Sequence, residues 1–248
     1  MLAMSEFQAL EFENLVRRRS SCRVPFNPLW RMSDRYLERL LEAARWAPTP
    51  HNMQNFEIVV VRDPKVLTEI SEVPSTPSEV FLRENYEQLA FSREELQRKA
   101  TGLLAEMFPP SWRSPDPKPD ALAESAHAFL GRSMQSAPML LIVLYDTRRR
   151  APASEGDALG LMGLGCVMQN LWLMANALGF GFQILSTFGG GDVENAVSRI
   201  LDIPAHMRIA FACRIGYPDS MLDGCYPRVR REVQEFTHYN RYGSRGPI

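Results

Sequence analysis

Two arginine-rich segments near opposite ends of this 248-residue chain carry the residue types that bind phosphate. The first runs from Arg17 to Arg23 and reads RRRSSCR, and the second is Arg228-Val229-Arg230-Arg231. A phosphate monoester dianion is bound by two or more guanidinium groups together with hydroxyl or backbone donors. The two segments predict one shared anion site if the fold brings them together, and solvated surface charge if it does not.

A proline-bracketed loop ahead of an apolar run is the second candidate for ligand binding. Pro48-Thr49-Pro50 ends a helix, because proline lacks a backbone donor and restricts the residue before it. His51, Asn52 and Gln54 then precede the run Phe56–Val61. A rigid loop with so many hydrogen-bonding side chains favours the binding of a polar ligand, and an ordinary helix-to-strand connection is the alternative.

The sequence contains no recognisable pattern of side chains for covalent or acid–base catalysis. We find no Ser-His-Asp order, paired carboxylate site, P-loop or metal-ligand spacing. Gly160–Gly165 does not fit a dinucleotide fingerprint, because it lies inside an expected helix. Gly189–Gly191 precedes another helix and either receives an anion on free N–H groups or is a flexible turn. An enzyme that lacks catalytic side chains takes its chemistry from a cofactor, so we expect no catalytic side chain and no metal.

The bulk composition excludes several classes of partner. Apolar residues make up 45% of the chain and charged residues 23%, with a net charge of −1. Nothing in this balance attracts nucleic acid or an anionic membrane. The four cysteines show no C-x-x-C pair, and acidic residues stand where a signal peptide needs basic ones. Both features favour a cytoplasmic protein.

The charge-free stretch Ala158–Leu178 is long enough to cross a bilayer, but we interpret it as a helix buried in a globular protein. Gln169, Asn170 and Asn176 would otherwise place three amides in hydrocarbon. Its glycines weaken helix propensity and make sense only where another backbone approaches closely. We therefore expect this helix to form the centre of the domain and the interface of a homodimer.

The remaining pattern mixes strands and helices without strict alternation, which is typical of an α+β or α/β sandwich. We expect one domain over residues 1–248 with a mostly helical insert at about 75–119. Strands are predicted at Phe56–Val61, Met139–Tyr145, Gly181–Ser186 and Met207–Ile215, and helices around Leu37–Ala44, after Asp63-Pro64, and at Thr76–Glu79, Ser92–Glu95, Ala121–Met134 and Val193–Leu201.

Taken together, these segments resemble the FMN-dependent nitroreductase family from about Asn14 to Tyr242, apart from the insert. Arg19-x-Ser21-x-Arg23 is similar to the family's N-terminal R-x-S-x-[RK] motif, and Pro48–Gln54 to its P-S-x-x-N-x-Q loop. Met162–Phe182 resembles its long interface helix and the GLG turn after it, and Arg228-Val229-Arg230 its C-terminal [KR]-x-R. Pro50 stands where a hydroxyl residue is common in the family.

The resemblance implies a three-layer α-β-α sandwich with a mainly antiparallel sheet, closed as an intertwined homodimer. It implies that FMN is bound by arginines at its phosphate, by polar side chains at its ribityl chain and ring, and by a backbone N–H near Ser186 at flavin N5. The loop of Pro48–Gln54 would reach the flavin of the partner subunit. The implied cofactor-binding residues are Arg19, Ser20, Ser21, Arg23, Pro48, Thr49, Pro50, Asn52, Gln54, Leu185, Ser186, Thr187, Arg228 and Arg230.

The activity that the resemblance implies is a ping-pong reaction. NAD(P)H would reduce bound FMN, which would then reduce a nitroaromatic, a quinone or a similar flat acceptor. Two alternatives remain open: a flavin-dependent dehydrogenase or oxidase of a dedicated substrate (or a flavin-consuming relative), and a non-catalytic FMN-binding protein. The aromatic residues of the insert, such as Phe81 and Trp112, would line an active-site lid or belong to an extra packed helix pair.

Overall fold

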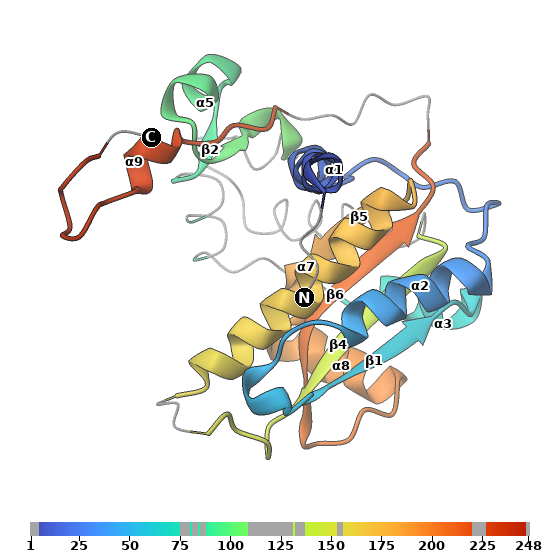
Figure 1. The fold of residues 1–248 in the computed structure, drawn as a ribbon. Helices are drawn as coiled ribbons and strands as arrows, with labels where there is room; N and C mark the ends of the chain where they lie inside the picture. Colours follow the sequence, from blue (N-terminus) through green and yellow to red (C-terminus); the bar gives the residue numbers. More distant parts are fainter. Residues whose placement is uncertain are drawn as a thin grey trace. The chain divides into compact units, whose positions relative to one another are not determined.

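An antiparallel sheet of four strands in the order β1-β4-β6-β5 lies at the centre of the first of two compact units, residues 1–75 and 130–224 (Figure 1). The structure is a computed structural model that describes residues 5–74, 80, 84, 88–108, 131, 137–152, 156–219 and 227–246. The strands are β1 (Phe56–Val61), β4 (Met139–Asp146), β5 (Gly181–Leu185) and β6 (Met207–Gly216). Each strand prediction is therefore confirmed within one residue at either end. β5 stops at Leu185 because Ser186–Phe188 turns into the short 3-10 helix η5.

Helices cover both faces of this sheet because its central strand is apolar on both sides. In β4, Met139, Leu141 and Val143 belong to one hydrophobic cluster with α2 (Asp34–Arg45) and α7 (Ala158–Ala177). The alternate residues Leu140 and Ile142 belong to a second cluster with α3 (Pro64–Ser71) and α8 (Gly191–Ile200). Since successive side chains of a strand point to opposite faces, this alternation produces three layers. The predicted α-β-α sandwich is confirmed.

The amides of α7 are bound inside the protein, as the sequence argument against a membrane span requires. Asn170 donates to the carbonyl of Ala43 at 2.9 Å, and Asn176 contacts Ser20 and Trp172. Of the helices that the structure describes, only α7 is long and apolar enough to cross a membrane, and a core helix satisfies the same criterion. A cytoplasmic location stays a prediction.

The first helix, α1 (Glu6–Arg18), begins with a capping box in which Ser5 and Gln8 satisfy each other's backbone N–H groups. None of its residues is buried, and the side chain of Phe7 is 69% exposed. This helix delivers the chain to Arg19, where the first arginine-rich segment leaves the helical conformation.

The chain divides into two compact units, of which the second comprises residues 76–129 and 225–248. Its described elements are β2 (Ala90–Phe91), α5 (Arg93–Lys99), β3 (Leu103–Leu104), η3 (Ala105–Met107) and α9 (Val233–Phe236). β2 and β3 pair in parallel, and Ser92 caps α5 as its sequence predicts. The predicted helix signals at Thr76–Glu79 and Ala121–Met134 lie outside the described residues, apart from Gly131. A single domain with an insert at 75–119 stays a prediction.

Candidate functional site

The N-terminal arginine-rich segment continues as an extended arm, residues 19–27, that runs beside the ends of β5 and β6. The backbone N–H of Cys22 donates to the carbonyl of Phe182 in β5 at 2.9 Å. Further along, Phe26 forms an antiparallel bridge with Pro218, just after β6. These backbone contacts hold both halves of the arm against the first unit.

Side chains from the last turns of α7 bind the arm at Ser20. Trp172 donates from its indole N–H to the carbonyl of Ser20 at 3.0 Å, and Asn176 accepts from the Ser20 N–H at 3.2 Å. The guanidinium carbon of Arg19 lies 4.2 Å from the centroid of the Trp172 ring, in a cation–π contact. Both backbone groups of Ser20 are therefore bound, and the side chain of Arg19 is oriented by stacking.

Two glycines that lie opposite each other in the sheet make room for Phe26. Gly181 of β5 pairs with Gly216 of β6. A Cβ on Gly181 would lie 2.6 Å from the ring of Phe26, and one on Gly216 would lie 2.9 Å from Phe26 Cβ. No larger residue fits at either position without moving Phe26, whose side chain is 1% exposed. Gly181, the second glycine of the Gly-Phe-Gly turn after α7, is thus required for packing the arm, as is Gly216.

A buried arginine completes the attachment of the arm. Arg214 of β6 is 1% exposed and donates from Nε to Gln183 Oε1 at 2.6 Å. Its Nη2 donates to the carbonyls of Val24 at 2.8 Å and Cys22 at 3.4 Å. Desolvation lowers the pKa of Arg214 to about 10, so the guanidinium keeps its charge at neutral pH.

The loop of residues 48–54 holds three non-glycine residues in the left-handed region. The φ angles are 50° for His51, 51° for Asn52 and 42° for Gln54, and Pro50–Asn52 form the 3-10 helix η1. Hydrogen bonds within the loop support this conformation: Gln54 donates from its backbone N–H to Thr49 Oγ1 at 3.2 Å and from its side chain to Asn52 Oδ1 at 3.0 Å. Strain of this kind at exposed polar side chains is typical of a binding loop.

The loop and the arm contact α7 at different positions along the helix axis. A Cβ on Gly163 would lie 3.1 Å from Cδ of Pro50 and 3.5 Å from Cα of Thr49, which explains why a glycine stands there. The arm contacts the same helix at Trp172, nine positions later. At 1.5 Å per residue, the two contact points lie about 14 Å apart along the helix axis. Gly165, by contrast, has open space beside it, so the expected close approach of another backbone does not occur within the protomer at that position.

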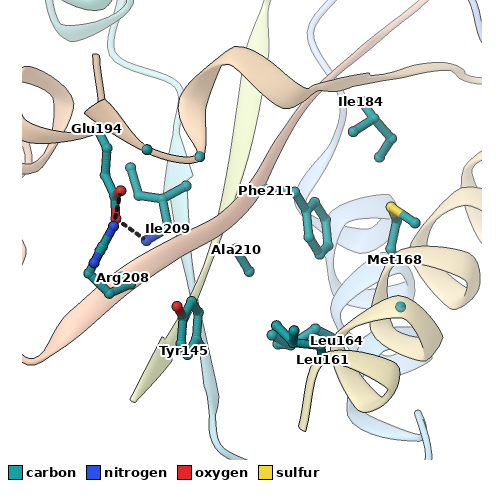
Figure 2. A pocket seen from close by; sticks show the side chains of 13 residues that line it. Tyr145, Leu161, Leu164, Met168, Ile184, Glu194, Arg208, Ile209, Ala210 and Phe211 are labelled. Atoms are coloured by element: carbon teal, nitrogen blue, oxygen red, sulfur yellow. Dashed lines mark hydrogen bonds and ion pairs between the residues drawn. The ribbon is translucent and has the colours of Figure 1, made fainter. Parts of the chain in front are cut away.

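A cavity of about 540 Å³ opens beside the end of β5, where the sequence predicts flavin contacts. Ile184, Gly189 and Gly190 line it on either side of the predicted residues Leu185, Ser186 and Thr187. Figure 2 shows apolar side chains from β5, β6 and α7 facing one another across it, among them Ile184, Phe211 and Met168. The other lining residues are Tyr145, Leu161, Leu164, Gly165, Glu194, Arg208, Ile209 and Ala210.

The charged wall of this cavity is a bidentate ion pair between α8 and β6 (Figure 2). Arg208 donates from Nε and Nη2 to the two carboxylate oxygens of Glu194 at 2.6 and 2.7 Å, and the Ile209 N–H donates to the same carboxylate at 3.0 Å. The hydrogen bonds from Arg208 are the main reason why the pKa of Glu194 lies below its usual value. Gly189 and Gly190 of the glycine-rich turn line the cavity together with this ion pair.

The structure brings only some of the predicted residues together. Leu185 is buried at the end of β5, and Thr187 lies in η5. Arg228 and Arg230 are exposed residues of the second unit, and their convergence with Arg19 and Arg23 stays a prediction. Sequence reasoning missed Trp172, Asn176 and Arg214. For Arg214 a signal exists, since an arginine inside the apolar run Phe211–Ile215 needs buried acceptors.

Comparison with protein families finds one model that matches most of the chain. Residues 16–217 match the model described as "Nitroreductase family". A protein of Staphylococcus saprophyticus described as an NADPH-dependent oxidoreductase is 23% identical over 213 residues, which cover 86% of this chain and 67% of that protein.

Solved structures with the same fold cover nearly the whole chain. The FMN and NADPH-dependent nitroreductase NfnB from Sphigopyxis has a TM-score of 0.65 at 16% identity, over 93% of this chain and 99% of that one. Iodotyrosine deiodinase, solved with FMN and 3-iodo-L-tyrosine, has a TM-score of 0.59 at 20% identity, over the same shares of the two chains. One neighbour is described as a nitroreductase and the other as a deiodinase, so the likeness identifies the fold and leaves the substrate open.

Proposed function

Because the chain belongs to the nitroreductase family, we propose that it is an FMN-dependent NAD(P)H oxidoreductase whose flavin phosphate binds to the arm. The observation that carries this proposal is the attachment of the arm through its backbone. Groups of Ser20, Cys22 and Val24 are bound by α7, β5 and β6, and this positions two arginines and a hydroxyl residue of the arm. The NADPH-dependent relative and the FMN-dependent structural neighbour support the choice of cofactor and reductant.

The donor set of the arm fits the phosphate of FMN. Arg19, Ser21 and Arg23 alternate with Ser20, Cys22 and Val24, whose backbone groups are bound to α7, β5 and β6. The three ligand-type side chains are half-buried, so they are partly shielded from water yet reachable by a ligand. A phosphate dianion is best bound by guanidinium and hydroxyl donors of this kind. Arg228 and Arg230 would complete the set.

Bound FMN would supply the redox chemistry of a ping-pong reaction between NAD(P)H and a nitroaromatic, a quinone or a similar flat acceptor. The chain's own residues bind and orient. The backbone N–H near Ser186 would donate to flavin N5. Ser21, Thr49, Asn52 and Gln54 would orient the ribityl chain and the ring. The apolar cavity at the end of β5 would exclude water from one side of the site.

The loop is proposed to serve the site of a second copy of the chain. Within one protomer the loop and the arm contact α7 about 14 Å apart, so the loop does not lie beside its own arm on this helix. The first half of α7 also exposes apolar side chains, with Leu161 55% and Met162 65% exposed. A homodimer that buries these side chains would carry each loop to the partner's flavin.

The visible spectrum of the purified protein, recorded before and after anaerobic addition of NADH or NADPH, tests this proposal. We expect a flavin spectrum that bleaches on reduction and recovers when an acceptor is added. Replacing both Arg19 and Arg23 by Ala should weaken FMN binding at least about tenfold for each arginine, since each charge-assisted hydrogen bond contributes about 1.5–3 kcal/mol. Arg199→Ala, at an exposed position of α8, is the matched control and should leave FMN binding unchanged.

Three other outcomes have distinct meanings. A colourless protein that does not bind added FMN would contradict the whole proposal. Bound flavin that NAD(P)H does not bleach, but that a dedicated substrate reduces, would identify a dehydrogenase or oxidase. Bound flavin that no donor or acceptor cycles would identify a flavin-binding protein without turnover.

A further inference from the structure

We propose that Arg214 is a positioning residue for the cofactor's phosphate: it fixes the backbone on both sides of Arg23 so that the arm is already in its binding conformation. This inference rests on the proposed function, because it assumes that the arm binds the phosphate of FMN. Arg214 itself does not touch the ligand in this scheme. It acts through the backbone of the arm.

The geometry of the Arg214 hydrogen bonds is specific for this role. Nη2 donates to the carbonyls of Val24 at 2.8 Å and of Cys22 at 3.4 Å, and these two residues flank Arg23 in the sequence. One nitrogen therefore binds the carbonyl of the residue before the phosphate-binding arginine and the carbonyl of the residue after it. A lysine in its place would present a single flexible ammonium group, whereas the guanidinium is a planar fork with a fixed direction.

That direction is set by the neighbouring strand. Gln183 of β5 lies directly opposite Arg214 in the register of the sheet, and its Oε1 accepts from Nε at 2.6 Å. On the other side, the guanidinium carbon lies 4.4 Å from the centroid of the Phe26 ring. With Nε bound to Gln183 and the plane packed on Phe26, Nη2 is left pointing at the arm. The two glycines under Phe26 let this stack approach the sheet closely.

Arg214 is a charged side chain buried in the middle of a strand. A buried guanidinium is costly unless its donors are satisfied, so an apolar side chain would be the simpler choice for the middle of a strand. The hydrogen bonds to the arm explain why a charged side chain stands there. Burial is the main cause of the lowered pKa of Arg214, and the charge of Arg23 lowers it further.

The test compares FMN with riboflavin, which has the same ring and ribityl chain but no phosphate. Fluorescence titration of the apoprotein gives a dissociation constant for each flavin. For Arg214→Met, we expect FMN binding to weaken at least tenfold while riboflavin binding changes less than threefold, so that the preference for FMN falls. Arg214→Lys should give an intermediate loss, because it keeps the charge but not the fork.

A second readout follows the arm without any ligand. In hydrogen exchange of the apoprotein, the amides of residues 20–24 should exchange faster in Arg214→Met than in the wild type, while the amides of β4 stay protected. Val197→Ala is the matched control. It truncates a fully buried side chain of α8 in the other hydrophobic cluster, so it should lower stability without changing the preference for FMN or the exchange of the arm.

Other results would overturn the inference. If FMN and riboflavin weaken equally in Arg214→Met, Arg214 supports the fold in general and does not position the phosphate site. If the wild type binds both flavins equally well, the arm binds no phosphate. If the wild type binds neither flavin, the proposed function fails, and the two failures are thus distinct. Should Arg214→Met not fold, Gln183→Leu removes the acceptor that orients Nε and should lower the preference for FMN in the same direction.

Discussion

Individual side chains in this protein connect segments that are distant in the sequence, and Glu194 is the clearest example outside the arm. It is 4% exposed, and its carboxylate binds the Arg208 guanidinium and the Ile209 N–H. It therefore joins α8 to β6. A carboxylate bound in this way stabilises the fold only while it is ionised.

The pH dependence of Glu194→Gln follows from the sign of this shift. Hydrogen bonds from Arg208 lower the pKa of Glu194 below its ordinary value of 4.5, so its contribution is complete above pH 4.5 and is lost as the pH falls through the folded-state pKa. We expect Glu194→Gln to lower the free energy of unfolding by roughly 1–3 kcal/mol at neutral pH and by much less near pH 3. Urea unfolding at the two pH values measures the difference.

Glu38→Gln, at an exposed position of α2, is the control and should have little effect at either pH. An equal loss of stability for Glu194→Gln at neutral and acidic pH would mean that the carboxylate is not ionised in the folded protein, or that its charge contributes nothing.

At the scale of elements, the two candidate binding elements differ in how they are held. The arm is fixed from outside, by α7, β5 and β6, whereas the loop of residues 48–54 is fixed mainly from within, by Thr49, Asn52 and Gln54. A loop that keeps three left-handed residues stores strain, and such strain persists where it serves binding.

Two substitutions of His51 test the left-handed conformation of the loop. His51→Val should lower the free energy of unfolding by roughly 1–2 kcal/mol, because a β-branched residue is strongly disfavoured at φ 50°. His51→Gly should change it by less than about 1 kcal/mol, because relief of strain offsets the extra entropy of the unfolded chain. Chemical denaturation of both variants, with the wild type alongside, measures the two values.

His51 is exposed and none of the predicted contacts to the flavin uses it, so both variants should still bind FMN if they fold. Equal stabilities for the valine and glycine variants would show that the loop does not hold the left-handed conformation in solution.

At the scale of the whole molecule, the proposed site needs two copies of the chain. Three features favour this arrangement: the separation of the loop and the arm along α7, the exposed apolar half of that helix, and α1, which has no buried residue. Iodotyrosine deiodinase and NfnB share the fold at 20% and 16% identity, so the sandwich tolerates large changes in sequence.

Mixed dimers of two defective variants test whether the site is shared. The first variant carries Arg19→Ala with Arg23→Ala, and the second carries Asn52→Ala with Gln54→Ala. Each homodimer should bind little FMN. A heterodimer, isolated with two different affinity tags, should regain one intact site per dimer, since one unchanged arm then meets one unchanged loop. The stoichiometry of bound FMN measures this, with the wild-type dimer as reference.

Two results would contradict the shared site. If the heterodimer binds no more FMN than either variant, the arm and the loop of one protomer serve the same site. If the wild-type chain sediments as a monomer while binding FMN, no partner is needed.

The sequence predicts local features of this fold well because their causes are local. The apolar runs of β1 and β4, the proline-terminated helix before the loop and the Asp63-Pro64 start of α3 follow from the preferences of neighbouring residues. The boundaries shift where a contact from elsewhere intervenes. For example, α8 begins at Gly191 and not at Val193, and its Glu194 binds Arg208 and the backbone of Ile209 in β6.

The sequence by itself determined which residues carry phosphate-binding chemistry, that a rigid polar loop precedes the first strand, and that an apolar helix forms the core, since composition and spacing fix these. Only the tertiary structure decided how the arm is held. Ser20 binds Asn176 across 156 positions, and Val24 binds Arg214 across 190, and no local pattern encodes contacts at such separations. The tertiary structure also decided that the arm and the loop contact α7 at separate positions along its axis, because these contacts depend on how the helix packs on the sheet.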